Sequence, residues 1–388
     1  MAMVSFCRVS RRSTRTAGRR QDDRAKLIGF AGILAIALIM AAAQRAPAAD
    51  APEQSGPWLV YPCVRVGQPP TIDGRLDDAA WFAAVPVSGF RYSSATNPKL
   101  VPYQMLMRLC WSGDWLYMGV KVEEPNMDKL VITAHRRDEY VFNDDSIEWF
   151  IDPAHSHSDF YQFGLNVAGA MWDAHVPNVA WDCDWRAAVA RGPDAWFAEI
   201  AIPIRALSKF APKTGTIWGF NLCHERQAGG HRELINWANV QGNFHNVELF
   251  GHLLFVERLC DLTPGLIRRA ADEAGRPTRI FVREGWWQVN GNARLIRYTD
   301  DLREAATEKI DRALRELRRT IDRDAQPELW AKYRALRDRW RQVRRKAVPE
   351  GELGPVEWAK ARIAIEEIEA VLPDLLWQAR LDALIRQL

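Results

Sequence analysis

The residues best suited to chemistry lie in one short segment, residues 142–152. Side chains alternate along a strand, so Glu148 shares one face of a predicted strand with Ser146 and Phe150. The opposite face is apolar and consists of Ile147, Trp149 and Ile151. Strands rarely carry Glu, and burial of an unpaired carboxylate is costly. Glu148 therefore needs a partner, either a fixed cation, a ring of hydrogen-bond donors, or the hydroxyl groups of a ligand.

The elements around this strand predict a mainly β region. Residues 103–111 and 115–122 flank a Ser-Gly-Asp turn and are typical of a hairpin. Further strands are expected at 146–151, 159–167, 185–190, 196–201, 217–223 and 252–256. Only residues 77–83 and 204–208 indicate short helices here. This spacing predicts an antiparallel β-sandwich over residues 50–260, followed by a connector with short strands at 261–299.

Residues 300–388 have helical periodicity instead. Apolar residues recur every three or four positions, at Leu302, Ala306, Ile310, Leu314, Leu317 and Ile321. A second helix begins at Pro327 and a third at Val356, with Pro373 expected to kink or divide the third. We predict a small helical hairpin or three-helix unit. It is either a packing appendage or a surface that binds a partner or a second copy.

Residues 1–49 have the composition of a targeting segment. Seven Arg and Lys residues between Arg11 and Lys26 precede an uncharged apolar run from Leu27 to Ala43. Ala46-Pro47-Ala48 then offers a cleavage site. The run is shorter than the about 20 residues of a spanning helix, which favours a signal peptide over a retained membrane anchor. Both alternatives predict an exported protein that is periplasmic, extracellular or membrane-anchored.

Composition excludes some other classes. The net charge is only +3, and much of the basic excess lies in the leader and the helical region, so we predict no nucleic-acid partner. Five cysteines follow the leader without any CxxC spacing, which allows one or two disulfides at most and no metal knuckle. Hydrophobic residues make up 48% of the chain and include 17 Trp, ample for a core.

Six motifs follow one another along the predicted sandwich. They are TIDGRLDDAAW at 71–81, WLYMGVKV at 115–122, DSIEWFID at 145–152, WFAEIAIP at 196–203, GFNL at 219–222, and Trp237 followed by FGHL at 250–253. In this order they resemble the family 9 carbohydrate-binding module, a DOMON-like β-sandwich, over about residues 64–256. The resemblance implies non-catalytic binding of a mono-, oligo- or polysaccharide in support of polysaccharide catabolism.

The resemblance also implies a ligand site. In the family, two aromatic rings sandwich a terminal sugar, and their positions match Phe142 and Phe244 here. The strand acid matches Glu148, and Asn243 and His245 flank the second ring. The family's Arg on the following strand is replaced by Gly164, so Arg136 or Arg137 is expected to supply the cation. Rings suit the apolar face of a pyranose, and charged acceptors suit its hydroxyls.

Three alternatives remain. The first is catalysis by two of Asp144, Asp145 and Glu148, because two acids about 5–10 Å apart could hydrolyse a glycosidic bond. Since Asp145 points away from Glu148 and Asp144 lies at the strand's start, we predict no enzyme activity. Some related sandwiches bind haem, and candidate ligands are Met105, Met107, Met118, His135 and His175. A structural or partner-docking module that has lost sugar binding is the third alternative.

We expect no cofactor. A structural calcium ion is compatible with the family and with the loop acids Asp152, Asp159, Asp182 and Asp184, but no spaced ligand loop identifies a metal site. A glycoside hydrolase or a cell-envelope protein is the partner class expected for the C-terminal helices.

Overall fold

The structure is a computed structural model and describes residues 56–96, 98–347 and 351–386. The expected targeting segment, 1–49, lies outside the described residues. Residues from Gly56 onward form one compact unit. No helix in the described part of the chain combines the length and the hydropathy needed to cross a membrane.

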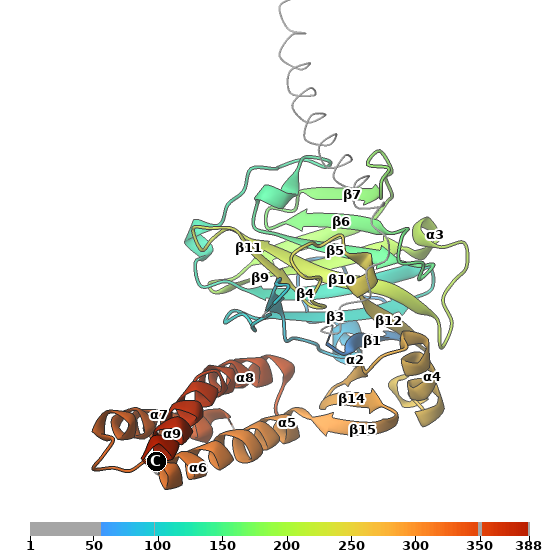
Figure 1. The fold of residues 1–388 in the computed structure, drawn as a ribbon. Coiled ribbons are helices and arrows are strands. Elements are labelled where there is room, and N and C mark those ends of the chain that lie inside the picture. Colours follow the sequence, from blue (N-terminus) through green and yellow to red (C-terminus); the bar gives the residue numbers. More distant parts are fainter. Residues whose placement is uncertain (1–55, 97, 348–350, 387–388) are drawn as a thin grey trace, which may run out of the picture. The chain divides into compact units, whose positions relative to one another are not determined.

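A β-sandwich forms most of this unit (Figure 1). Its strands are β1 (Trp58–Arg65), β2 (Arg91–Tyr92), β3 (Met105–Ser112), β4 (Trp115–Glu123), β5 (Ser146–Asp152), β6 (Tyr161–Asn166), β7 (Met171–His175), β8 (Arg186–Arg191), β9 (Ala195–Pro203), β10 (Ile217–Arg226), β11 (Glu233–Asn236) and β12 (Gly251–Val256). The main order is β7-β6-β5-β10-β12-β1-β3-β4-β9-β8. Pairing is antiparallel except where β1 runs parallel to β12 and β3. The predicted fold class is confirmed.

Strand β5, which carries Glu148, lies between two antiparallel neighbours. Glu148 stands opposite Gly164 of β6 and Cys223 of β10. As predicted, the face of β5 that carries Trp149 points into the main core. The other face carries Glu148 and Phe150, and Phe150 belongs to a separate cluster on the outside of the sheet. We call this side of β6, β5 and β10 the outer face.

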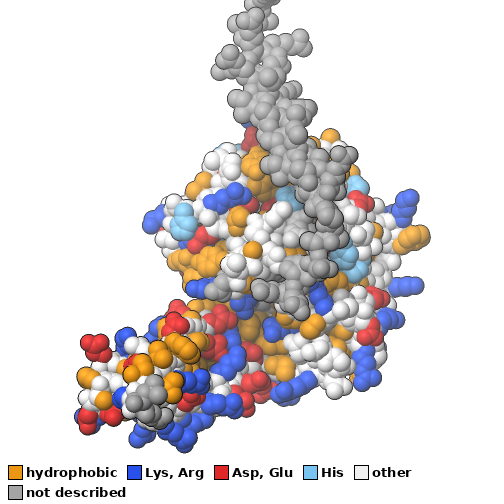
Figure 2. All heavy atoms as spheres, in the orientation of Figure 1, with side chains coloured by type: hydrophobic (Ala, Val, Ile, Leu, Met, Phe, Trp, Pro, Cys, Tyr) orange, Lys and Arg blue, Asp and Glu red, His pale blue; other side chains and the backbone are white. Residues whose placement is uncertain are grey.

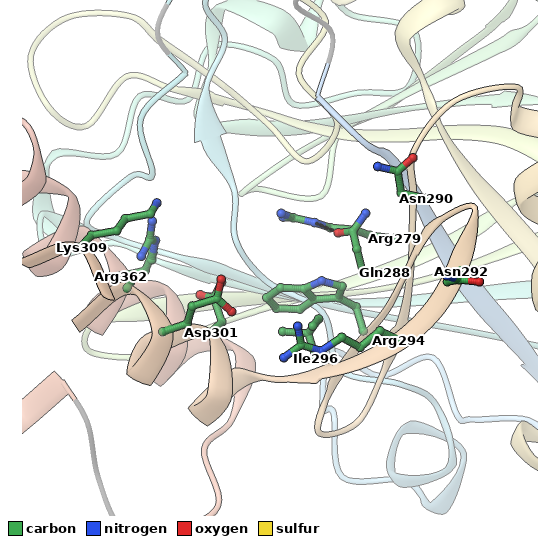
Figure 3. A pocket seen from close by; sticks show the side chains of 12 residues that line it. Arg279, Gln288, Asn290, Asn292, Arg294, Ile296, Asp301, Lys309 and Arg362 are labelled. Carbon is green, nitrogen blue, oxygen red and sulfur yellow. Dashed lines mark hydrogen bonds between the residues drawn. The ribbon is translucent and has the colours of Figure 1, made fainter. Parts of the chain in front are cut away.

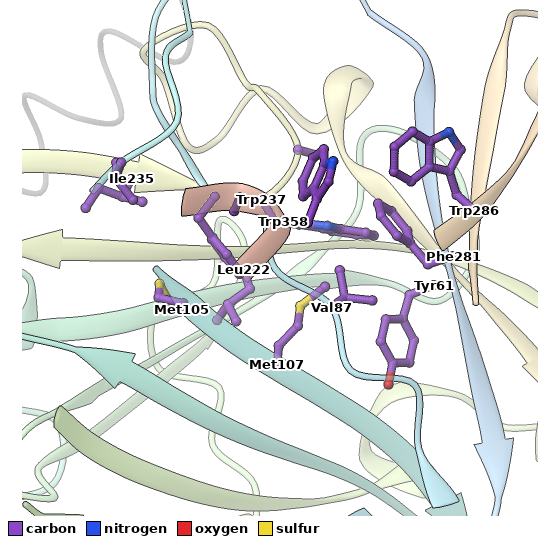
Figure 4. Close-up of a cluster of buried hydrophobic side chains, with 14 of the residues drawn as sticks. Tyr61, Val87, Met105, Met107, Leu222, Ile235, Trp237, Phe281, Trp286 and Trp358 are labelled. Carbon is purple, nitrogen blue, oxygen red and sulfur yellow. The ribbon is translucent and has the colours of Figure 1, made fainter. Parts of the chain in front are cut away.

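The main core continues beyond the sandwich. Figure 4 shows Met105 and Met107 of β3 and Leu222 of β10 in one cluster with Trp286 and Trp358. The five cysteines in the described residues are all free thiols and form no crosslinks. These are Cys63, Cys110, Cys183, Cys223 and Cys260.

Short helical turns connect the strands. They are α2 (Ala79–Ala83), η1 (Met127–Lys129), η2 (Val141–Asn143), α3 (Ile204–Leu207), η3 (Val247–Leu249) and η4 (Leu259–Asp261). Between the sandwich and the C-terminal helices lie α4 (Pro264–Ala274) and the strands β13 (Thr278–Val282), β14 (Gly285–Asn290) and β15 (Asn292–Arg297). Helix α4 was not predicted, although Thr263 caps its first turn, Pro264 begins it, and Gly275 ends it in a left-handed conformation.

The C-terminal region contains α5 (Tyr298–Glu304), η5 (Ala305–Asp311), α6 (Arg312–Thr320), α7 (Pro327–Ala347), α8 (Pro355–Glu369) and α9 (Leu372–Ile385). Segment η5 is a π-helix inside one continuous helix. Its wider turn explains why the apolar residues recur every four positions from Leu302 to Leu314. All of these apolar residues are buried. The predicted third helix is divided at Ala370 and Val371, just before Pro373. Figure 2 shows acidic and basic side chains interspersed over the helical region.

One tryptophan joins the helices to the sandwich. The Trp358 indole of α8 packs against Trp286 and Tyr298, with ring centroids 5.5 Å away in each case. Its Nε1 donates to Asp301 at 2.8 Å. A methyl group on Gly89 would lie 3.1 Å from the Trp358 ring, and the positive φ of 93° at this position also favours glycine. A nearby ion pair joins Lys360 to Glu123 of β4 at 2.8 Å.

A buried carboxylate holds the first motif onto the sandwich. Glu199 of β9 is fully buried and accepts hydrogen bonds from the backbone of Asp73 and Gly74, each at 2.8 Å. It also accepts from the Trp81 indole at 2.7 Å. Two motifs that are far apart in sequence, 71–81 and 196–203, therefore meet at one acid.

Substitution Glu199→Gln tests this contact. The amide retains an acceptor but places an NH₂ group against one of three buried donors, so we expect the free energy of unfolding to fall by roughly 1–3 kcal/mol. Urea denaturation measures the change. The control Glu257→Gln removes a surface acid paired with Arg65 and should cost less than about 1 kcal/mol. Equal effects of the two substitutions would contradict the anchoring role.

Candidate functional site

The outer face places Glu148 at one end of a short series of hydrogen bonds. The Glu148 side chain is 3% exposed. Gln162 of β6 donates from Nε2 to Glu148 Oε1 at 2.5 Å, and its Oε1 lies 3.2 Å from His245 Nε2. These hydrogen bonds therefore link β5, β6 and the loop before η3.

The two acids that precede Glu148 have a structural role. Asp144 accepts four hydrogen bonds, from the backbone and hydroxyl of Thr133, the backbone of Ala134, and the side chain of Asn166. Burial raises its pKa, but these bonds outweigh burial and leave the pKa below its usual value. Asp145 accepts from the backbone of Val131, Gln227 and Ala228. Both acids thus hold loops and need no ligand.

Glu148 differs from them in its donors. Among the described residues, Gln162 is the one side chain that donates to it. Burial and the neighbouring Glu225 carboxylate raise the pKa of Glu148 well above the usual value, against the opposing effects of Gln162 and Arg232. Glu148 is therefore a buried acceptor with unused hydrogen-bonding capacity.

The cation near this acid is Arg232. It binds Glu225 with two hydrogen bonds of 2.6 and 2.9 Å, and its side chain remains 49% exposed. The predicted replacements lie elsewhere. Arg136 pairs with Glu139 at 3.2 Å. Arg137 binds Asp173, Asp182 and the carbonyl of Cys183, and stacks on Trp185.

Both predicted rings are nearly closed to solvent. Phe142 is 5% exposed and packs with Val141, Ala134, Ala170 and Trp172. Phe244 is 6% exposed and belongs to another cluster, which contains Phe150, Phe160, Val240, Val247 and Phe250. The structure therefore assigns the two rings to different packed clusters. Their contact with a ligand stays a prediction.

An exposed ring lies beside Phe142. Tyr140 is 54% exposed and meets Phe142 edge to face, with centroids 5.2 Å apart. Burial raises the pKa of its hydroxyl, and the charges of Glu225 and Glu148 add to this against the opposing charge of Arg232.

The remaining predicted residues shape the loop. Asn243 is exposed, and its Oδ1 accepts from the His245 backbone at 3.0 Å. The His245 ring packs edge to face on Phe150 at 5.5 Å, and burial lowers its pKa. His245 therefore joins Glu148 through Gln162, whereas Arg137 does not join this group.

Sequence reasoning missed Tyr140, Gln162, Glu225 and Arg232. The parity of the predicted strand at 159–167 was a usable signal for Gln162 alone, because it shares the outer face with Gly164. The other contacts join segments distant in sequence.

The absence of the family Arg has a local explanation. A Cβ atom at Gly164 would lie 2.7 Å from Val141 Cγ2 and 2.9 Å from Phe142 Cε1. Residues of η2 thus occupy the space above Gly164, where a longer side chain would start. The absence of a side chain at Gly164 therefore allows Phe142 to occupy its buried position.

Comparisons with known proteins agree with this fold. The family described as "Carbohydrate family 9 binding domain-like" matches residues 72–258. Residues 72–258 are a family 9 carbohydrate-binding-like domain. This family consists of binding modules and is non-catalytic, in agreement with the prediction of no enzyme activity. No curated protein matches the chain.

Solved structures of such modules are also similar. One is a carbohydrate-binding module of family 9 from Caldicellulosiruptor kristjanssonii in complex with cellotriose, 21% identical over 53% of this chain and 97% of that one, with a TM-score of 0.40. Another, from the same organism in complex with glucose, is 20% identical over 53% of this chain and 100% of that one, with the same TM-score of 0.40.

The loop acids do not assemble into a metal site in the part of the chain that the structure describes. In those ranges, no group of three or more His, Cys, Asp or Glu side chains is arranged to hold a metal ion. The calcium expectation therefore has no assigned residues.

Substitution Gly164→Ala tests the packing above β6. The added methyl would contact Val141 and Phe142 too closely, so we expect a loss of about 1–3 kcal/mol in unfolding free energy. The double variant Gly164→Ala/Phe142→Leu should recover part of this loss, because the two sites are in contact. Gly67→Ala, with open space around it, is the matched control. Additive effects of the two substitutions would contradict the coupling.

A second test uses the pH dependence of stability. The raised pKa of Glu148 means that the folded protein binds its proton more tightly than the unfolded chain, so the stabilising contribution is present below about pH 4 and is lost as pH rises. Glu148→Gln removes this dependence. We expect the variant to gain stability over the parent as pH rises from about 5 to about 8, measured by thermal unfolding. The exposed acid variant Glu273→Gln should show no such trend; an identical trend for both would refute the assignment.

Proposed function

We propose that this protein binds saccharides without catalysis, on the outer face of β5, β6 and β10. One observation supports this most strongly: Glu148 is a buried carboxylate with a single side-chain donor among the described residues. Asp144 and Asp145, on the same segment, have their oxygens bound by four and three donors respectively. Sugar hydroxyls supply the donors that Glu148 lacks.

The neighbouring residues suit the same ligand. Tyr140 offers an exposed ring for the apolar face of a pyranose, and Phe142 supports that ring from below. Arg232, which is bound to Glu225, and His245, which reaches Glu148 through Gln162, are the groups that would donate to ring or hydroxyl oxygens. In this proposal Tyr140 takes the role expected for Phe142, and Arg232 takes that of the missing Arg. Phe244 and Asn243 hold the loop that carries His245.

The setting of this binding is also a proposal. The composition of residues 1–49 supports an exported protein, and the matched family supports a role in polysaccharide catabolism beside a glycoside hydrolase or a cell-envelope partner. In this proposal the protein holds substrate near a catalytic partner.

Isothermal titration calorimetry tests the proposal. A panel of neutral oligosaccharides, cellotriose included, should contain a ligand whose affinity falls about tenfold or more in Glu148→Gln and in Tyr140→Ala, since the first removes an acidic hydrogen-bonding group and the second a stacking ring. The control Phe210→Ala removes an exposed ring in another loop and should bind normally. Binding that survives both site variants would disprove the site.

Two further outcomes separate the alternatives. If no saccharide in a broad glycan array binds, the protein is the partner-docking module that has lost sugar binding. If the purified protein releases reducing ends and Glu148→Gln abolishes the release, it is a hydrolase.

A further inference from the structure

A polar cavity lies outside the matched domain, between the strands β13–β15 and the helices α5 and α8. Figure 3 shows it, and its volume is about 320 Å³. The lining includes four cationic side chains and two acids, so its charge is positive. The cations are Arg279, Arg294, Lys309 and Arg362, and the acids are Asp301 and Glu304.

One wall is a row of side chains across three strands. Arg279 of β13 pairs with Gln288 of β14, which pairs with Arg294 of β15. The alternation of strands puts these three on the same face. The Arg279 guanidinium stacks on Trp286 at 4.9 Å, and its Nε donates to Gln288 at 3.1 Å. Neither Arg279 nor Arg294 forms an ion pair with a carboxylate of the described residues.

The opposite wall comes from the helices. Arg362 of α8 binds Glu369 at 3.1 Å, and Lys309 lies 3.6 Å from the same acid. Even so, the buried Nη1 of Arg362 has no hydrogen-bond partner in the described part of the protein. Asp301, one of the two acids of the lining, accepts a hydrogen bond from the Trp358 indole at 2.8 Å.

Two guanidinium groups that form no ion pair with the described residues, opposite an Nη1 that has no hydrogen-bond partner there, are suited to an oxyanion. Amide side chains extend the row toward the hairpin turn, where Asn290 stands opposite Asn292. Amides bind hydroxyl groups through both a donor and an acceptor. The cavity is larger than a simple inorganic anion requires, and its size lies at the lower end of those of small-ligand sites.

We propose that this cavity binds an acidic saccharide, with Arg279 and Arg294 holding the carboxylate of a uronic acid and the amides of Gln288, Asn290 and Asn292 holding its hydroxyls. The site is distinct from the outer face and depends on the packing of the C-terminal helices against β13–β15. It gives those helices a binding role for an anionic sugar residue.

Calorimetry with the full chain and trigalacturonic acid tests the proposal, with neutral galactotriose as the uncharged counterpart. The acid should bind and the neutral sugar should not. Arg294→Gln and Arg279→Gln should each weaken binding about tenfold or more, because each removes a charge-assisted hydrogen bond. Arg294 is exposed, so its variant folds even if loss of the more buried Arg279 destabilises the chain. The control Arg297→Gln removes an exposed charge from the other face of β15 and should bind normally.

Every other result overturns the proposal. Absence of binding at millimolar ligand, or equal binding by the Arg294 variant, removes the site. If inorganic phosphate binds as tightly as the trimer, the cavity is a simple anion site. Glu148→Gln should leave trigalacturonate binding intact; a loss there would place the acidic sugar on the outer face and leave this cavity without a ligand.

Discussion

The structure depends on how its buried carboxylates are satisfied. A sandwich of this kind brings acids into the sheet, and each one is costly unless donors surround it. Glu199 holds the first motif to β9, and Asp145 joins the loops before β5 and after β10. On β10, the buried Arg226 binds Glu124 with two bonds of 2.6 and 2.9 Å. These acids connect distant segments in a chain whose described cysteines are all free.

The packing around Glu148 explains how a site changes while the fold remains. Phe142 fills the space above Gly164, so the sheet cannot carry a long cation on β6. A cation is present on the loop after β10 instead, where Arg232 binds Glu225 with two hydrogen bonds, and in the proposed site it takes the place of the missing Arg. In the proposed site the acid of the motif thus remains, while the ring and the cation come from other segments. A change of this kind alters ligand geometry without altering the strand pattern.

Local periodicity predicted most of the fold, because it reports which face of each element is buried. The alternation at 146–151 and the stripe from Leu302 to Ile321 both appear in the structure, and the stripe even reflects a π-helix in its four-residue steps. Helix α4 was missed, although its caps were visible at Thr263 and Gly275. The site was harder to predict. Tyr140 and Arg232 approach Glu148 only through tertiary packing, which no local pattern encodes.

The buried acids of the outer face have unequal numbers of hydrogen-bond donors, and this difference affects the stability of the fold. A carboxylate with spare acceptor capacity destabilises the fold when charged, and it persists only if neighbouring elements are held by stronger contacts. Both flanks of β5 meet this condition: Asp144 and Asn166 fix the start of β5 to β6, and Arg226 with Glu124 fixes the end of β10. The surrounding network therefore lets Glu148 remain underbonded, which is the state that a hydroxyl-bearing ligand requires.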